Sequence, residues 1–451
     1  MGLVQKAGAS LAVVLLIAAC GSPAATTKPS TAASAAATAS AAATASAAAT
    51  ASAAATASPT EAATASPTAA ASASASPTAA ASASASAGAS ATASAGASMS
   101  AGDFSLGFSN AFGIGNGFRE EQLCTAKAEA SVLGFQPSTW IHQDDATYPQ
   151  LQQFRDLIAA HPSAIIFNPN SPDGLNQAID EAQAAGIKTI AIDAYVTDPE
   201  TLNLSNDQFN YGYVGAKWLF EQLGGEGNVY YMRGIVGHPA DLDRHAGVMK
   251  ALDENPGIHL LPSNDGVGTD WSPDKGTQLI TDLINNGGYD DIQGIWTSGI
   301  DQQVVDAIQA AGKPFVPIVG ADLKGFVEQL LNKVTDTNPD GTKYEGLTGI
   351  AVYNPAAVGG AGVKLAAEVL NGETPETTSV DRTDSQGNPV KVNAVFLPIP
   401  EAYDNVSEEG KAKLAEIDVD GLDNLWPVSW YINDMTDYTF EQMQACKGPG
   451  E

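Results

Sequence analysis

Several apolar segments of the sequence are followed by a side chain that can donate or accept hydrogen bonds. They precede Asn110, Asn168, Asp193, Arg233, Ser298 and Asp322. A carboxylate accepts hydrogen bonds, a guanidinium donates them, and amide and hydroxyl groups do both. A single polar residue after a strand is often only a solvated turn. Six in one chain predict that several strand ends meet at a shared ligand cleft.

Motifs for other chemistry are weak. Residues 113–117 are rich in glycine but lack the G-x-G-x-x-G spacing of a dinucleotide loop. His238 and His245 flank two aspartates, but no second cluster accompanies them to complete a zinc site. A glycosidase needs two opposed carboxylates, and no motif selects such a pair. We therefore expect no metal, no cofactor and no catalytic residue.

The elements that would position the polar residues alternate between strand and helix. Strands are expected at 104–109, around Trp140, and at 164–167, 189–192, 229–232, 258–261, 292–296, 315–319 and 349–353. Helices are expected at 117–132, 151–159, 246–253, 304–311, 326–331 and 358–370. Continuous apolar strands between helices are typical of α/β proteins with parallel sheets covered on both faces. About a dozen strands exceed one compact sheet, so two doubly wound lobes are expected, with ligand beyond the strands' carboxyl ends.

The composition separates a low-complexity region from the folded part. Residues 21–101 contain 70 Ala, Ser or Thr among 81 positions and no aromatic residue. Such a segment buries too little apolar surface to offset its ordering entropy, so we expect a disordered tether. The folded part is expected at 102–451. The formal net charge of the chain is −30, which excludes nucleic acid as a partner on electrostatic grounds.

The N-terminus predicts an extracytoplasmic location. Lys6 precedes the apolar run 11–19, which is too short to span a bilayer and ends at Cys20. Small residues before this cysteine resemble a bacterial lipobox, so residues 1–20 are interpreted as a lipoprotein signal peptide. Lipid on Cys20 would then be the only membrane anchor. The alternative is an ordinary signal peptide with a chance cysteine.

A family resemblance rests on a series of short motifs in order along residues 103–400. They are Gly107-Phe108-Ser109, Phe167-Asn168-Pro169, Ala191-Ile192-Asp193, Arg244-His245-Ala246-Gly247, Val319-Gly320-Ala321-Asp322 and Asn354-Pro355. This order resembles the type 1 periplasmic binding proteins, and among them the ribose- and galactofuranose-type sugar receptors of ABC transporters.

The resemblance implies two Rossmann-like lobes that close on a ligand and are joined by three crossings, near Asn206, Asn354 and Ala394. One lobe would contain residues 103–206 with 354–394. The other would contain residues 207–353 with 395–451. A monomer that delivers its ligand to a transporter permease is the expected form. A ligand sensor with a signalling partner, or a secreted carbohydrate-active enzyme, is the alternative.

The resemblance also implies roles in binding a sugar, which presents hydroxyl groups and an apolar ring face. Asp193 and Asp322 would accept hydroxyl protons, unless they only cap strand ends. Phe118 and Trp271 would cover the ring, although Phe118 could belong to the core. The remaining candidate ligand-binding residues are Asn116, Arg119, Asn168, Arg244, Ser298 and Tyr353.

Two features qualify these roles. Arg244 could instead form a buried pair with Asp241 or Asp243. Ala194 follows Asp193 where ribose-type receptors have an arginine, so the expectation is a sugar or sugar-like polyol rather than ribose itself.

Two cysteines remain after Cys20, and the expected compartment is oxidising. Cys124 lies on the first predicted helix, and Cys446 follows the aromatic stretch 426–440 in a C-terminal segment longer than that of the relatives. We expect a Cys124–Cys446 disulfide that holds this segment beside the first helix. The alternative is a pair of buried free thiols.

Overall fold

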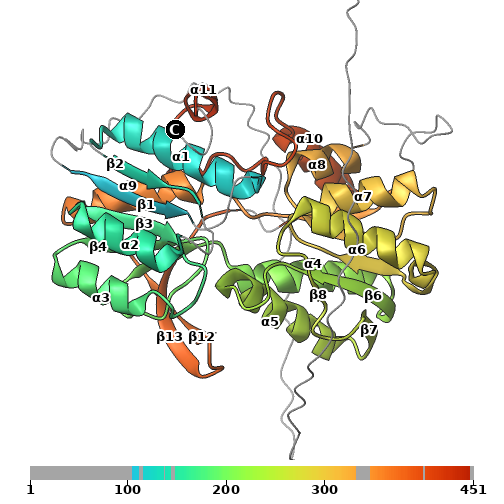
Figure 1. Ribbon diagram of the computed structural model, residues 1–451. Coiled ribbons are helices and arrows are strands. Elements are labelled where there is room, and N and C mark those ends of the chain that lie inside the picture. Colours follow the sequence, from blue (N-terminus) through green and yellow to red (C-terminus); the bar gives the residue numbers. More distant parts are fainter. Residues whose placement is uncertain are drawn as a thin grey trace, which may run out of the picture. The chain divides into compact units, whose positions relative to one another are not determined.

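A computed structural model of the chain describes residues 104–110, 115–136, 138–143, 148–331, 346–399 and 402–446. The expected signal peptide, Cys20 and the tether lie outside these residues. The described part contains two mainly parallel sheets with helices on both faces, as expected for an α/β protein with two doubly wound lobes (Figure 1).

The sheet of the first lobe has seven strands. Their order is β12 (Thr378–Thr383), β13 (Pro389–Phe396), β5 (Leu202–Ser205), β4 (Lys188–Ile192), β3 (Ala164–Asn168), β1 (Leu106–Asn110) and β2 (Ser138–Ile141). Helices α1 (Gly117–Leu133) and α9 (Val358–Leu370) share one apolar cluster with the strands, and α2 (Gln150–Ala159) and α3 (Asn176–Ala184) share another. Successive strand residues Ile165 and Ile166 enter different clusters, because strand side chains alternate between the two faces.

The sheet of the second lobe follows the same plan. Its order is β14 (Ala402–Asp404), β11 (Gly349–Val352), β10 (Ile318–Ala321), β9 (Gly294–Trp296), β6 (Glu226–Arg233) and β7 (Gly257–Leu261), with β8 (Val267–Gly268) beside the end of β6. Helices α4 (Gln208–Gln222) and α5 (Pro239–Glu254) cover one face. The other face is covered by α6 (Pro273–Asn285), α7 (Asp301–Ala310) and α8 (Lys324–Leu330), and a short 3-10 helix lies at Gly288–Asp291.

Local sequence explains where α1 begins and ends. The Asn116 side chain accepts a hydrogen bond from the Arg119 amide, which satisfies a free N–H group of the first turn. The helix ends at Gly134, whose φ of 80° is left-handed and suits glycine. This start directs the first turn of α1, with Phe118 and Arg119, toward the carboxyl end of the sheet.

Three of the chain passages between the lobes lie near the expected positions. The first follows β5, and the second lies between β11 and α9. The third follows the end of β13 at Phe396, slightly later than expected, because Ala394 still pairs with Asn203 inside the first sheet.

The C-terminal segment differs from the prediction that residues 395–451 all belong to the second lobe. Strand β14 and helix α10 (Glu408–Ile417) do pack there, but α11 (Phe440–Gln444) lies beside α1 of the first lobe (Figure 1). Ile432 is buried in the first lobe's core, and the Asp437 amide donates to Glu129 Oε2 over 2.8 Å. We call residues 418–446 the C-terminal strap. It forms a fourth passage between the lobes, driven by burial of its apolar side chains.

Cys124 and Cys446 meet at the end of this strap. Their Cα atoms are 5.3 Å apart and their sulfur atoms lie at bonding distance. Most Cα separations across disulfides fall in the range of about 4.4–6.8 Å.

Glu121 on α1 is an exception to the rule that buried polar groups find partners. It is fully buried, and neither carboxylate oxygen has a hydrogen-bond partner among the described residues. Burial, reinforced by the charges of Asp322 and Asp423, raises its pKa well above 4.5.

This carboxyl makes the stability of the fold dependent on pH. Above pH 4.5 the unfolded chain loses a proton that the folded chain retains, so we expect stability to fall as pH rises toward the raised pKa. The contribution is about 1.4 kcal/mol per pH unit within that window. Denaturant unfolding from pH 5 to pH 8 should show a shallower decline for Glu121→Gln than for wild type. The exposed Glu221→Gln is the matched control, and equal slopes for both variants would contradict the assignment.

Candidate ligand-binding site

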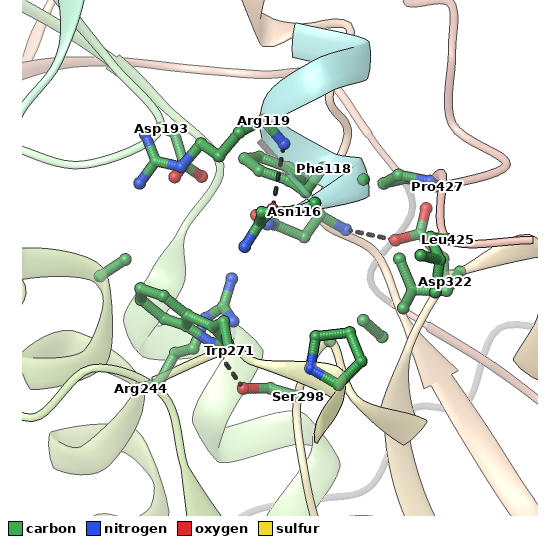
Figure 2. Close-up of a pocket in the computed structure, with 18 residues that line it drawn as sticks. Asn116, Phe118, Arg119, Asp193, Arg244, Trp271, Ser298, Asp322, Leu425 and Pro427 are labelled. Atoms are coloured by element: carbon green, nitrogen blue, oxygen red, sulfur yellow. Dashed lines mark hydrogen bonds between the residues drawn. The ribbon is translucent and has the colours of Figure 1, made fainter. Parts of the chain in front are cut away.

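A pocket opens where strand ends of both lobes meet (Figure 2). The space among its lining residues is about 640 Å³, open solvent included. Its lining includes the predicted residues Asn116, Phe118, Arg119, Asp193, Arg244, Trp271, Ser298 and Asp322. Lining residues that were not among the predicted ligand-binding residues include Ala240, Pro273, Leu323, Asn354, Leu425 and Pro427.

Arginine side chains from both lobes supply hydrogen-bond donors to the pocket. Arg119 of the first lobe donates through Nη1 to Asn110 Oδ1 over 3.1 Å. Its Nη2 lies 3.3 Å from His238 Nε2 of the second lobe. Arg244 of the second lobe lies over the Tyr211 ring, with Cζ 4.0 Å from the centroid. Both guanidiniums are therefore held in place before any ligand contact is made.

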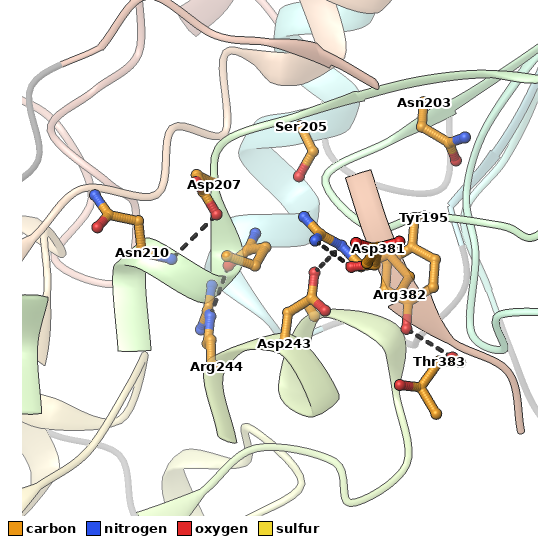
Figure 3. A network of polar contacts seen from close by, with 12 residues as sticks. Tyr195, Asn203, Ser205, Asp207, Asn210, Asp243, Arg244, Asp381, Arg382 and Thr383 are labelled. Atoms are coloured by element: carbon orange, nitrogen blue, oxygen red, sulfur yellow. Dashed lines mark hydrogen bonds and ion pairs between the residues drawn. The ribbon is translucent and has the colours of Figure 1, made fainter. Parts of the chain in front are cut away.

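The buried pairs resolve the alternative interpretation of Arg244. Asp241 pairs with Arg233, Oδ2 to Nη2, over 2.5 Å. Asp243 pairs with Arg382 from the hairpin of β12 and β13, Oδ2 to Nε, over 2.8 Å (Figure 3). Both aspartates thus have other arginine partners, and Arg244 is directed to the pocket. Arg233, one of the six strand-end residues, does not line it.

The Asp243–Arg382 pair also joins the lobes. Arg382 belongs to the first sheet and Asp243 to α5 of the second lobe. The Arg382 Cζ atom also lies 5.7 Å from the centroid of the Tyr195 ring. The Tyr195 hydroxyl donates to the Thr383 carbonyl over 3.0 Å (Figure 3). Burial raises the pKa of Asp243 to about 7, and the Arg382 charge opposes that rise. The hairpin therefore contacts the opposite lobe beside the pocket.

Gln208 organises the polar end of the pocket and was missed by the sequence analysis. Its Nε2 donates to Asp193 Oδ1 over 2.9 Å and to Asn354 Oδ1 over 3.0 Å. Its Oε1 accepts from Arg244 Nε over 2.7 Å. The buried Gln208 amide thus connects Asp193 of the first lobe and Arg244 of the second lobe to Asn354, which lies in the second passage between the lobes. Its only sequence signal is its place two residues after Asn206.

Asn168 and Tyr353 do not line the pocket. Asn168 is buried behind it and donates through Nδ2 to Asp193 Oδ2 over 3.1 Å, so it positions the carboxylate. The Tyr353 ring meets Tyr403 edge-on at 5.5 Å and lines a separate hollow near Asn206. Because the side chains of successive residues in an extended chain point in opposite directions, Asn354, the residue after Tyr353, lines the pocket and Tyr353 does not.

Trp271 is held in an unusual backbone conformation. Its φ is 50°, and its amide donates to Thr269 Oγ1 over 3.2 Å. The indole Nε1 donates to Ser298 Oγ over 3.4 Å, and the ring meets His238 edge-on at 5.0 Å. A Cβ at Gly234 would fall on the indole, so the ring needs glycine there.

His238 remains uncharged beside this ring. Burial, with the charges of Arg119 and Arg244, holds its pKa well below 6.5. The imidazole Nδ1 accepts from the Ala240 amide over 3.2 Å. His245 lies elsewhere, with Nδ1 3.1 Å from the Tyr231 hydroxyl. Within the described ranges, no three or more His, Cys, Asp or Glu side chains form a group suited to a metal ion.

Asp322 is more enclosed than the resemblance implies. Its exposed fraction is 0%, Oδ1 accepts from the Asn354 amide over 3.0 Å, and Oδ2 accepts from Ser429 Oγ of the strap. Burial raises its pKa to about 6, and the Ser429 hydrogen bond opposes that rise. Both oxygens therefore already have protein partners.

The fold and sequence have clear relatives. The periplasmic binding protein domain matches residues 106–374. The xylitol-binding protein of Mycolicibacterium smegmatis is 26% identical to this chain. The matched region covers 53% of this chain and 66% of that protein. The ribose import binding protein of Escherichia coli K12 is 25% identical over 55% of this chain and 79% of its own length.

A solved ABC transporter solute-binding protein from Thermobispora bispora superposes with a TM-score of 0.56 at 20% identity, covering 72% of this chain and 90% of its own. None of the helices in the described part of the chain is both long and apolar enough to cross a membrane. The matched family consists of solute-binding proteins rather than enzymes, and its name indicates an extracytoplasmic location. Since its model covers more than half of the sequence, the chain belongs to the periplasmic binding protein domain family.

Proposed function

We propose that this protein is the extracytoplasmic receptor of an ABC importer and captures a small sugar or sugar-like polyol. The observation that carries the proposal is the pocket lining, which brings Arg119 and Asp193 from one lobe toward Arg244 and Trp271 from the other. Donors and acceptors suit hydroxyl groups, and the indole suits an apolar ring face. Relatives named for xylitol and ribose support this ligand class.

The mechanism we propose is closure of the lobes around the ligand. A ligand that contacts both lobes gains all of its hydrogen bonds only when they are closed, so binding shifts the population to that state. Gln208 would keep Asp193 and Arg244 aligned during closure because it bonds to both. The closed state delivers the ligand to the permease.

The test is a thermal-shift screen of monosaccharides, polyols and nucleosides, followed by small-angle scattering. A bound sugar should raise Tm through mass action and reduce the radius of gyration. A hit found only among nucleosides would overturn the ligand class. An unchanged radius at saturation would overturn closure. Recovery of the sugar unchanged after incubation checks that the protein does not convert it.

Removing the Trp271 ring should weaken binding of the sugar found in that screen. Loss of the contact with the sugar's C–H face should cost roughly 1.4 kcal/mol, or about tenfold in affinity by calorimetry. Trp271→Phe keeps a ring and should retain most of the affinity. Trp218→Phe, at a tryptophan bonded to Asp404 and outside the pocket lining, is the control. Wild-type affinity in Trp271→Ala would contradict the assignment.

We also propose that Cys20 carries lipid and that residues 21–101 tether the receptor to the membrane. The support is the small-residue pattern before Cys20 and the composition of the tether. Metabolic labelling with a fatty-acid analogue should mark wild type and not Cys20→Ser. Equal labelling of both would refute this anchor.

A Cys124–Cys446 disulfide is proposed from the 5.3 Å Cα separation and the expected compartment. Mass spectrometry of a non-reduced proteolytic digest should contain one cross-linked peptide pair. Two separate thiol peptides from exported protein would contradict it.

A further inference from the structure

One end of the pocket is apolar. Leu425 and Pro427 of the C-terminal strap lie beside Ala321 and Leu323, which flank Asp322. Figure 2 shows Leu425 and Pro427 across the pocket from Asp193 and Arg119. We call Ala321, Leu323, Leu425 and Pro427 the apolar wall. Of the charged side chains that line the pocket, Arg119, Asp193 and Arg244 thus gather at one end, and Asp322 lies at the other end among hydrocarbon.

The strap part of this wall is firmly attached to the second lobe. The Lys324 amide donates to the Trp426 carbonyl over 2.8 Å, and the Val428 amide donates to the Asp322 carbonyl over 2.8 Å. Beneath it, Lys324 Nζ lies 2.5 Å from Asp418 Oδ1, and both side chains are buried. Leu425 also abuts the first turn of α1, because a Cβ at Gly117 would collide with the Leu425 carbonyl. The wall therefore belongs to the packed structure.

The strap also hydrogen-bonds to Asp322, the carboxylate that lines this end among the described residues. Ser429 donates to Asp322 Oδ2, and Oδ1 already accepts from Asn354. A ligand hydroxyl pointed at the wall would lose its hydrogen bonds to water without full replacement, which is unfavourable. A methyl group or a hydrogen at the same place would bury apolar surface instead.

From this arrangement we propose that the C-terminal strap makes the site selective for sugars that carry a methyl group or a hydrogen where common hexoses carry a hydroxymethyl group. The inference rests on the proposed sugar-binding function. It assigns Leu425 and Pro427 as specificity-determining residues, and Ser429 as the residue that withdraws Asp322 from ligand recognition.

Three matched sugar series test the selectivity by calorimetry with the full chain. They are D-galactose, D-fucose and L-arabinose; D-glucose, D-quinovose and D-xylose; and D-mannose, D-rhamnose and D-lyxose, and the members of each series differ only in a hydroxymethyl, methyl or hydrogen substituent. In the series that binds, the methyl or hydrogen member should bind about tenfold to a hundredfold more tightly than the hydroxymethyl member. Equal or tighter binding of the hydroxymethyl member would overturn the inference while leaving sugar binding intact. No heat with any member, together with no sugar hit in the thermal-shift screen, would overturn sugar binding and this inference together.

Variants assign the preference to the strap. Leu425→Asn should bring the affinity ratio between the methyl or hydrogen member and the hydroxymethyl member toward one. Val406→Asn, at an exposed valine outside the pocket lining, should leave this affinity ratio unchanged. Ser429→Ala frees one Asp322 oxygen and should improve binding of the hydroxymethyl member by about fivefold or more. The melting temperature of each variant checks folding. An unchanged ratio in both folded strap variants would overturn the assignment.

Discussion

Arg244→Ala should lower sugar affinity by more than about a hundredfold. Arg244 as a residue is 5% exposed, and its guanidinium is held by Gln208 and the Tyr211 ring. Hydrogen bonds to a charged group contribute about 1.5–3 kcal/mol each, and alanine removes all the donors that the Arg244 guanidinium offers the ligand. Two such losses exceed the roughly 2.7 kcal/mol that corresponds to a hundredfold change.

Matched variants separate this role from a general effect of charge. Arg244→Lys retains the cation but not the planar fork, so we expect an intermediate loss. Arg155→Ala removes an arginine from a half-exposed pair with Glu181, Nη2 to Oε1 at 3.5 Å, and should bind as wild type does. If Arg244→Ala retained wild-type affinity, the polar end of the pocket would not be the binding site.

Removal of the Cys124–Cys446 bond should produce the largest loss of stability. The two residues are 322 positions apart, and cross-links that close long loops restrict the unfolded chain most. We expect Cys124→Ala/Cys446→Ala to lose about 2–5 kcal/mol and to melt roughly 5–10 °C lower. The fold should persist, because Glu129 still accepts from the Asp437 amide and the Tyr438 hydroxyl still donates to the Trp430 carbonyl over 2.6 Å.

Reduction provides an independent comparison. Wild type in reductant should melt at the temperature of the double variant, and the double variant should not respond to reductant. Equal melting temperatures for wild type and double variant without reductant would show that the bond does not stabilise the domain. Because residues 423–429 are attached mainly to the second lobe, sugar preference should persist in the double variant.

Local patterns in the sequence were sufficient for the architecture and for much of the pocket. The alternation of apolar strands and helices predicts the two parallel sheets. It can be recognised locally, because the spacing of apolar residues and the turn residues that end each element lie within a few positions of one another. Strand-end positions also predicted that Asp193, Ser298 and Asp322 would converge, since parallel strands present their carboxyl ends at one edge. Family resemblance added Phe118, Arg119, Arg244 and Trp271, which also line the pocket.

Tertiary structure alone decided how these residues are used. Gln208 acquires its role only when Asp193, Arg244 and Asn354 converge on it from separate parts of the chain. The strap crosses to the first lobe because its apolar residues find a surface on α1, which no local pattern specifies. Before it crosses, the strap packs on the second lobe and brings Ser429 to Asp322, a residue 107 positions earlier, so a predicted ligand-binding carboxylate also has a partner within the protein. Such pairings depend on packing between distant segments, and the sequence around either residue contains no signal for the other.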